Sequence, residues 1–271
     1  MSQVIKNFKR YRYLLGELAK KNIKLKYRRS YLGILWTMIE PLLTMIVLSV
    51  VFGELLGRAG REDVAFAGVP FPVYVLTGRL LYSFFSSSTN SAMKSIRANG
   101  GMIKKVYVPK YMYPLSGILS NFVIFLISLV VLVGVMIFFV ATGSYKAPMN
   151  GYMFLAIVPL INLLLLAIGA GLTLATLCVF FRDIEYLWSV LLMLIMYCSA
   201  IFYFASSLSP QKQTLIKINP LYGIIHNFRR ALFGQPFDMT LLGYTFGISI
   251  VAIGIGMFIF YRKQDTFILN I

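Results

Sequence analysis

The fold is decided by residues 152–205, which read YMFLAIVPLINLLLLAIGAGLTLATLCVFFRDIEYLWSVLLMLIMYCSAIFYFA. Two apolar runs, 152–181 and 184–205, are separated here by Arg182 and Asp183 alone. Each run reaches the ~20 residues that a helix needs to cross a bilayer. The pattern therefore predicts two membrane-spanning helices joined by a tight turn. In that turn we expect Asp183 to cap the second helix and Arg182 to bind the last carbonyls of the first.

Four other apolar runs occupy residues 33–56, 71–92, 112–140 and 239–261. Hydrophobic residues make up 59% of the chain and charged residues 13%, whereas a soluble domain carries about 45–50% and about 25%. The sequence therefore predicts an all-α integral membrane protein with six transmembrane helices, folded as a single domain over residues 1–271.

Residues 1–32 precede the first run and predict a cytoplasmic amphipathic segment. Apolar residues recur at three- and four-residue spacing from Val4 to Leu25, and lysines and arginines occupy other positions. Such a helix is too charged to cross a bilayer, so we expect it to lie in the membrane interface.

Basic residues are distributed unevenly among the predicted loops. The N-terminal segment, the loop after 71–92 and the tail 262–271 are rich in lysine and arginine, and the alternate loops hold fewer. Because basic loops stay in the cytoplasm, both termini are predicted to be cytoplasmic. An even number of crossings follows, which agrees with six in residues 33–261.

The net charge of +17 does not indicate nucleic-acid binding, because the basic residues gather at the ends of apolar runs, where they meet membrane lipids. Cys178 and Cys198 lie inside apolar runs, and His226 is the single histidine. No metal, cofactor or catalytic site is therefore expected. The phosphate-binding pattern G-x-x-x-x-G-K-[ST] is missing, so ATP is not expected to bind this chain.

The segment 206–237 is long for an external loop and half apolar. Pro210 and Pro220 interrupt it, and Gly234 can end a helix. Two short re-entrant external helices between the fifth and sixth spans fit this pattern, provided that protein or water covers their backbone. An ordinary surface loop is the alternative.

Two ionisable residues, Glu40 and Arg79, fall inside predicted spans, at similar depths from opposite sides. Each must face protein or water. Each either lines a pore or contacts substrate, or else it forms a structural ion pair or extends to the membrane interface. Hydroxyl groups in 71–92 either join helices or line a hydrated path. Aromatic residues near the end of 184–205 form an interface belt or a stacking surface for sugar rings. The candidate path residues are Arg79, Tyr82, Phe84, Phe85, Ser87, Asn90, Tyr197, Phe202, Tyr203 and Phe204.

Four stretches in order resemble the permease subunit of type 2 ABC exporters for O-antigen, capsule and teichoic acid. The first runs from Tyr27-Arg28-Arg29-Ser30-Tyr31-Leu32-Gly33-Ile34-Leu35-Trp36 to Glu40-Pro41-Leu42. The second is the basic loop 104–114. The third is Phe180-Phe181-Arg182-Asp183-Ile184, and the fourth is Asn219-Pro220-Leu221-Tyr222.

This resemblance implies a permease homodimer in the bacterial cytoplasmic membrane, flanked by two copies of a separate ATPase that bind ATP and Mg. It also implies a lipid-linked glycan as substrate. The basic residues on the cytoplasmic side are then expected to contact the ATPase. They are Lys94, Arg97, Lys104, Lys105 and Lys110, and Tyr107 of the same loop is expected to contact the ATPase with them.

Three other functions remain open at this point. A drug or lipid ABC exporter would have a narrower pore, without the hydroxyl and aromatic lining that a polymer needs. A membrane-embedded glycolipid-modifying enzyme would need a polar catalytic cluster, which the sequence does not offer. An ion-coupled transporter would need intramembrane acids and repeat symmetry.

Overall fold

The computed structural model describes residues 2–28, 30–55, 66, 68–105, 108–146 and 151–269. Every regular element within them is a helix, so the prediction of an all-α chain is confirmed. The long helices are α1 (Ser2–Tyr27), α2 (Trp36–Leu48), α3 (Phe71–Ala98), α5 (Met112–Ala141), α6 (Ile157–Phe180), α7 (Ile184–Tyr197) and α10 (Met239–Lys263). The shorter ones are α4 (Gly100–Ile103), α8 (Pro210–Lys217) and α9 (Pro220–Leu232).

Irregular turns extend several of these helices. A 3₁₀ turn, η1 (Gly33–Leu35), precedes α2, and a π-helical stretch, η2 (Ser49–Leu55), continues it. Two further 3₁₀ segments, η3 (Gly151–Ala156) and η5 (Gln264–Leu269), flank α6 and α10, and η4 (Ala205–Ser207) precedes α8.

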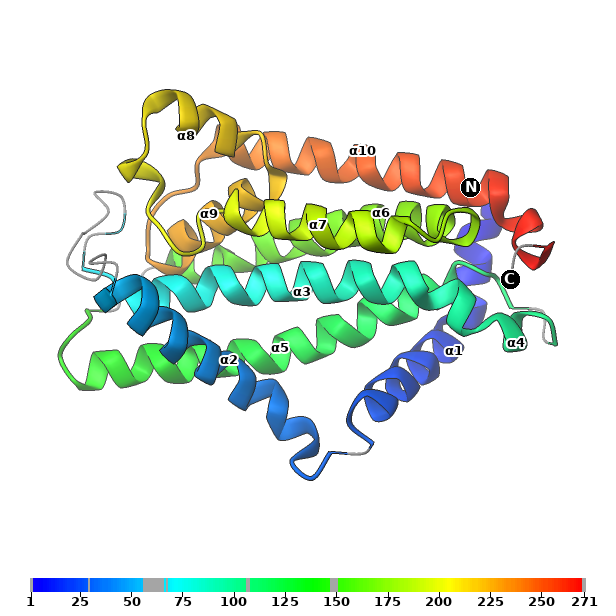
Figure 1. Cartoon of the computed structure of the whole chain (residues 1–271), viewed down its shortest axis with the longest axis horizontal. Helices are drawn as coiled ribbons and strands as arrows, with labels where there is room; N and C mark the ends of the chain where they lie inside the picture. The colour runs from blue at the N-terminus through cyan, green and yellow to red at the C-terminus, as the bar shows by residue number, and fades with distance from the viewer. Residues whose placement is uncertain are drawn as a thin grey trace.

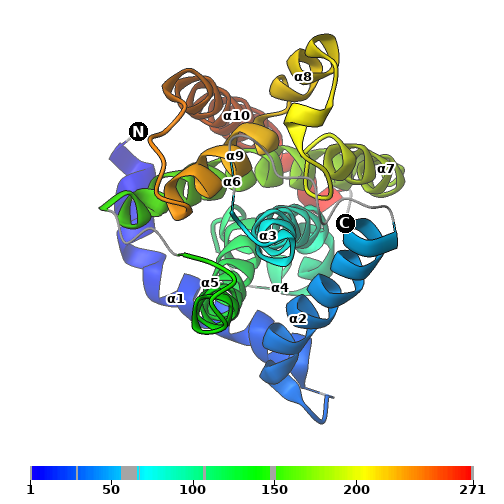
Figure 2. The same ribbon diagram turned by 90° about the vertical axis from the view of Figure 1, so that its left-hand side faces the viewer.

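The helices α3, α5, α6, α7 and α10 lie along the long axis of the molecule, and successive ones run in opposite directions (Figure 1). The chain ends, α1 and α4 gather at one end of this bundle, and α8 and α9 lie at the other. Viewed down the bundle, α3 occupies the centre and the other helices surround it (Figure 2). Helix α2 crosses the bundle obliquely and diverges from α1 like one arm of a V (Figure 1).

Four segments in the described part of the chain are long and apolar enough to cross a membrane: Gly33–Glu54, Met112–Ala141, Gly151–Phe180 and Met239–Ile268. Their bounds agree closely with four of the predicted runs. Helix α3 has a comparable length of 28 residues, but its many polar residues lower its hydropathy.

The fifth predicted run needs a correction. It was expected to be a span over 184–205, but the helix ends at Tyr197 after 14 residues, a length of about 21 Å. The chain then turns through Ala200, whose φ of +47° is in the left-handed region. An apolar composition that continues to residue 205 does not reveal this break.

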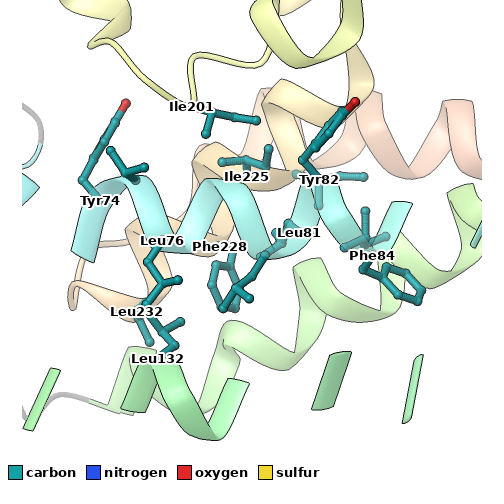
Figure 3. Packing of buried hydrophobic residues seen from close by; sticks show 14 of the residues in the cluster. Tyr74, Leu76, Leu81, Tyr82, Phe84, Leu132, Ile201, Ile225, Phe228 and Leu232 are labelled. Carbon is teal, nitrogen blue, oxygen red and sulfur yellow. The ribbon is translucent and has the colours of Figure 1, made fainter. Parts of the chain in front are cut away.

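The most polar long helix inside the bundle, α3, is also its most buried. Residues Val73 to Gly78 are buried in succession, so neighbouring elements cover every side of this turn. Figure 3 shows Leu76, Leu81 and Tyr82 pointing in different directions from α3, toward side chains of other elements. The buried hydroxyls of α3 bond within the helix: Thr77 donates to the Tyr74 carbonyl, and Thr89 to that of Phe85. Local pairing of this kind allows polar residues to lie in an apolar core.

Candidate functional site

One face of α3 is polar along most of the helix. Every residue between positions 79 and 97 that is not buried is polar. Their spacing of three and four residues places most of them on one side of the helix. We call this face the polar stripe, and it consists of Arg79, Ser83, Ser86, Ser87, Asn90, Ser91, Lys94 and Arg97.

The other faces of α3 join helices, as one of the two sequence-based alternatives for its hydroxyls expects, and a hydrated path along the helix stays a prediction. Trp188 of α7 donates its indole N–H to the Thr89 hydroxyl at 3.1 Å, and Thr89 is fully buried. The stripe, in contrast, is partly exposed along its length. Exposed hydroxyls and charges at membrane depth require water or protein beside them.

A cleft opens beside the half of the polar stripe that begins at Arg79. It lies between α2, α3, α5 and the end of α1, and has a volume of about 240 Å³. We call it the α2–α3 cleft, and its charged, amide and serine lining includes Lys26, Glu40, Arg79, Ser83, Ser87 and Asn121. Glu40 and Arg79, the two charges that fall inside predicted spans, therefore line one cleft. Among the described residues no ion pair joins them.

Pro41 explains how α2 is attached to α5 at this cleft. Proline inside a helix has no N–H, so the carbonyl four residues earlier, that of Thr37, loses its intrahelical partner. The Ser128 hydroxyl of α5 donates to this carbonyl at 3.1 Å. The Glu-Pro pair thus places a carboxylate in the cleft and frees a carbonyl that binds the neighbouring helix.

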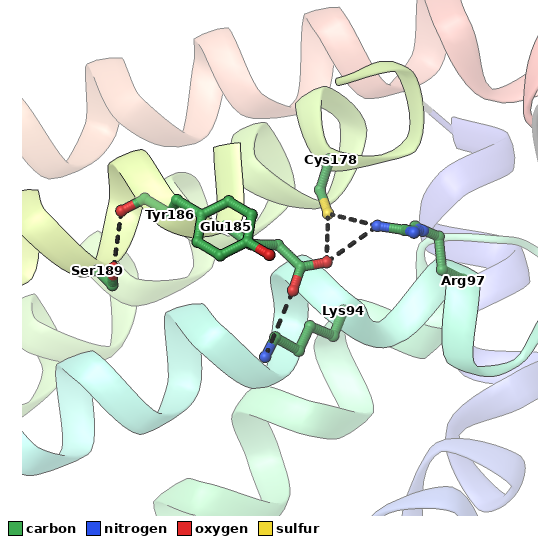
Figure 4. Close-up of polar contacts among 6 residues, drawn as sticks. All are labelled: Lys94, Arg97, Cys178, Glu185, Tyr186 and Ser189. Carbon is green, nitrogen blue, oxygen red and sulfur yellow. Dashed lines mark hydrogen bonds and ion pairs between the residues drawn. The ribbon is translucent and has the colours of Figure 1, made fainter. Parts of the chain in front are cut away.

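Glu185 joins the Arg97 end of the polar stripe to α7 (Figure 4). Its carboxylate lies 2.9 Å from the Arg97 guanidinium and 3.5 Å from the Lys94 ammonium. The Cys178 thiol, at 3.5 Å from Glu185, completes the cluster. Lys94 and Arg97 lie about 90 residues from Glu185 in the chain, so the sequence alone does not reveal these ion pairs.

The turn at Arg182 and Asp183 is confirmed, because α6 ends at Phe180 and α7 begins at Ile184. The predicted side-chain roles are wrong. Asp183 occupies the N-cap position, but its side chain accepts no capping hydrogen bond. In the described part of the chain, Arg182 makes no side-chain bond to the carbonyls of α6. Backbone bonds close the turn, from Ile184 N–H to the Phe181 carbonyl and from Glu185 N–H to that of Arg182.

We therefore expect Glu185→Ala to destabilise the protein by roughly 1–2 kcal/mol, because Lys94 and Arg97 lose their partner. The matched control is Asp183→Ala, which removes an exposed carboxylate two residues away that makes no cap. The melting temperature of the purified protein in detergent measures both changes. Equal melting temperatures for the two variants would show that the cluster contributes nothing.

The seven aromatic candidates lie in different surroundings. Tyr82, Phe84, Phe85, Phe202 and Phe204 are buried, and Tyr197 is 54% exposed. Phe84 packs on Phe125 and lines the α2–α3 cleft, and Phe202 stacks on Phe52 with ring centres 4.9 Å apart. The Tyr203 hydroxyl donates to the Tyr197 carbonyl at 2.7 Å. Sugar contact by these residues stays a prediction.

The basic residues expected to contact an ATPase gather at the end of the bundle near the chain termini. Lys94 and Arg97 bind Glu185, and Lys110 donates to the Gln264 carbonyl at 2.6 Å. Lys104 and Lys105 are exposed just after α4. Tyr107 lies outside the described residues. Of the other path candidates, Asn90 lines a second polar cleft of about 330 Å³ beside Asn22 of α1.

Sequence reasoning missed Arg229 of α9, which is 2% exposed. Its guanidinium donates to the Tyr74 carbonyl at 2.9 Å, the Ala200 carbonyl at 3.0 Å and the Thr77 hydroxyl at 3.2 Å. It also lies 3.5 Å from the centre of the Tyr74 ring. Arg229 therefore binds the irregular backbone that follows α7. An arginine in the largely apolar segment 221–233 was the sequence feature that could have indicated a buried role.

Asn219, of the Asn-Pro-Leu-Tyr stretch, ties α9 to the same break. Its side-chain oxygen accepts the Leu221 N–H at 3.1 Å and so caps α9. Its amide nitrogen donates to the Cys198 carbonyl at 3.2 Å and to the Ser199 hydroxyl at 3.0 Å. The Asn219 side chain thus caps the start of α9 and also gives a hydrogen-bond donor to a carbonyl at the end of α7.

A sequence model described as ABC-2 type transporter matches residues 13–233. The chain is 28% identical over 257 residues to the O-antigen export system permease protein RfbA of Klebsiella pneumoniae, covering 94% of this chain and 93% of that protein. It is 25% identical to the polysialic acid transport protein KpsM of Escherichia coli, over 93% of this chain and 94% of that one. The capsule polysaccharide export inner-membrane protein CtrC of Neisseria meningitidis serogroup B is 25% identical, over 83% and 80%.

Proposed function

The chain belongs to the ABC-2 type transporter family, and we propose that it is the membrane subunit of an ATP-driven polysaccharide exporter. Its substrate is a lipid-linked glycan of the O-antigen, capsule or teichoic-acid type, which crosses the bacterial cytoplasmic membrane. The relatives described above have names that specify O-antigen export, polysialic acid transport and capsule polysaccharide export, and none of these names indicates a drug exporter or an enzyme.

The observation that carries this proposal is the polar stripe on the central helix. A glycan needs hydroxyl, amide and charged groups that exchange hydrogen bonds as it slides, and the stripe supplies them over residues 79–97. In a single copy the stripe residues are not fully buried, and contact of these polar groups with lipid would be costly. A homodimer that encloses two stripes removes this cost and forms a hydrated path.

The helix directions support a six-span topology for this permease. In order, α2, α3, α5, α6, α7 and α10 would cross, with both termini in the cytoplasm and α8 and α9 outside. Helix α9 is largely buried and α8 is mostly exposed. Of the two, α9 is therefore the helix that would re-enter the membrane, against α3, α6 and α10.

A separate ATPase supplies the energy in this proposal. Two copies, each with bound ATP and Mg, would dock on the cytoplasmic ends of two permeases, where Lys104 and Lys105 are exposed. The chain itself should then hydrolyse no ATP. ATP hydrolysis by the purified permease alone, free of any contaminating ATPase, would contradict this division of work.

An export assay tests the proposed path. We expect Asn90→Leu and Ser86→Leu to reduce glycan export at least tenfold at matched expression, because a branched apolar side chain interrupts the polar stripe. The control is Thr240→Leu, an exposed position near the start of α10. Surface glycan would be measured in cells that lack the native permease. Normal export by both stripe variants would rule out the stripe as the path.

The aromatic candidates give a separate expectation. Tyr197→Ala should reduce export without loss of folded protein, because this ring is 54% exposed and its recorded ring contact is an edge-on one with Phe202, with 6.4 Å between the ring centres. Phe204→Ala should instead lower the folded yield, because Phe204 packs edge-on against Tyr74 at 4.8 Å. Yield by gel filtration and export in cells separate the two effects. Normal export by Tyr197→Ala would favour an interface belt over sugar stacking.

A further inference from the structure

Arg79 and Arg229 differ in how the protein satisfies them. Arg229 finds three acceptors in the core. Arg79 makes no hydrogen bond or ion pair with any described residue, and its nearest recorded partner is the Tyr82 ring at 5.6 Å. An arginine carries five N–H donors in a fixed planar fork. Those of Arg79 line the α2–α3 cleft without a protein acceptor.

A second cation reaches the same cleft from α1. Lys26 makes no hydrogen bond or ion pair within the described part of the chain, and its ammonium lies 5.8 Å from the Tyr27 ring. Partial burial lowers the pKa of the Lys26 ammonium, and the nearby Glu40 carboxylate acts in the opposite direction. Lys26 is an exposed residue, so its ammonium is available to a ligand that enters the cleft.

The remaining lining is suited to an anion with several oxygens. Two cations and one carboxylate leave the cleft with a net positive charge. The Ser83 and Ser87 hydroxyls also line it, and neither donates to another described residue. A phosphate group has oxygens enough for the guanidinium, the ammonium and both hydroxyls, and arginine recognises phosphate in a bidentate manner.

From this geometry we infer that the α2–α3 cleft binds the phosphate group of a membrane lipid, with Arg79 as the principal contact and Lys26 as the second. The cleft is lined by the ends of α1 and α2, which diverge from each other (Figure 1). Leu43 and Val47 of α2 are 51% and 59% exposed close to it. A lipid chain beside these residues would deliver its phosphate sideways from the bilayer. The inference depends on the membrane position of the chain and not on the identity of its glycan.

Binding to the purified full chain in an uncharged detergent tests this inference. Native mass spectrometry would follow titration with dioctanoyl phosphatidic acid, geranylgeranyl phosphate, dioctanoylglycerol and inorganic phosphate. We expect both phosphate lipids to bind and dioctanoylglycerol, which lacks the phosphate, to bind at least tenfold more weakly. A preference for phosphatidic acid would identify a bulk phospholipid as the source, and a preference for geranylgeranyl phosphate an isoprenoid carrier. Either preference supports the site.

Substitutions then locate the binding. Arg79→Gln should weaken phosphate-lipid binding about tenfold or more, since a hydrogen bond to a charged group contributes about 1.5–3 kcal/mol. Lys26→Gln should weaken it severalfold. The control is Arg182→Gln, which removes an exposed cation outside the cleft. Arg79 has no protein bond to lose, so its variant should melt like the wild type. If it did not, Lys26→Gln and Ser83→Ala would test the same cleft with Arg79 intact.

Three results would overturn the inference. The first is unchanged binding in both Arg79→Gln and Lys26→Gln. The second is equal binding of dioctanoylglycerol and phosphatidic acid, which would mean that the phosphate is not recognised. The third is displacement of the lipids by inorganic phosphate at equal concentration, which would show an anion site without a lipid. Absence of glycan export by the wild-type chain, with lipid binding intact, would count against the proposed function and leave this site standing.

Discussion

Replacing Arg229 with methionine should lower the free energy of unfolding by about 3–5 kcal/mol, a loss typical of a broken buried polar network. Methionine fills much of the same space, so the lost hydrogen bonds dominate the effect. The Ala200 and Tyr74 carbonyls and the Thr77 hydroxyl would each lose a donor in the core. Unsatisfied backbone at this depth destabilises the break after α7, and the folded yield should fall with it.

Two companion variants make this prediction specific. Arg230→Met changes the neighbouring arginine, which is partly exposed, and should cost less than about 1 kcal/mol. Arg229→Lys keeps the charge but loses the planar fork, so it should rescue little of the stability. Titration of the purified proteins with dodecyl sulfate would measure the three changes. If Arg229→Met unfolded at the same detergent ratio as the wild type, the guanidinium would not hold the break.

The same contact explains why the sequence did not predict the end of α7. The end of α3 also differs from the prediction, because the run 71–92 stops six residues before the helix ends at Ala98. Residues 112–140 and 239–261 predict α5 and α10 to within two residues, because polar residues follow both runs. Residues 198–205 are as apolar as the helix before them. The break there depends on Asn219 and Arg229, which belong to α9. Hydropathy indicates whether a segment prefers lipid or water. It does not indicate that side chains from another helix will end the segment's helix.

The sequence identified individual residues of the candidate site but did not show which of them lie together. A charge inside an apolar run is visible in the sequence, which is why Glu40 and Arg79 were found. That both line one cleft, and that Lys26 joins them, depends on how α1 and α2 fold against α3. Likewise, the acid that pairs with the basic residues of α3 is Glu185 and not Asp183. The sequence does not show which of these two neighbouring acids forms the ion pairs, because the choice depends on where α3 packs against α7.

Gly169→Ala is the second change with a large expected effect, and it acts on the seam between α6 and α10. A methyl group at Gly169 would lie 2.5 Å from the Ala252 carbonyl carbon and 2.6 Å from the Ile253 nitrogen. Backbone atoms cannot move aside as a flexible side chain can. The helices must separate, which we expect to cost about 2–3 kcal/mol as an overpacked contact.

Separation would also weaken the polar contacts of this seam. Asn162 of α6 donates to the Thr245 hydroxyl at 2.8 Å and accepts from the Ser249 hydroxyl at 2.7 Å. All three side chains are fully buried. Interhelical hydrogen bonds in membranes contribute about 0.6 kcal/mol each, so their weakening adds to the cost of the methyl group. Close approach at Gly169 and polar pairing at Asn162 therefore depend on each other.

Gly254→Ala is the matched control on α10, because a methyl group there meets nothing within 4 Å. Alanine has a higher helix propensity than glycine, by about 0.5–1 kcal/mol. The two substitutions are chemically identical and should differ in sign: Gly254→Ala stabilises slightly or changes nothing, and Gly169→Ala destabilises. Dodecyl sulfate titration of both proteins decides the matter. Equal shifts would mean that helix propensity, and not the approach of two backbones, sets the role of glycine at this seam.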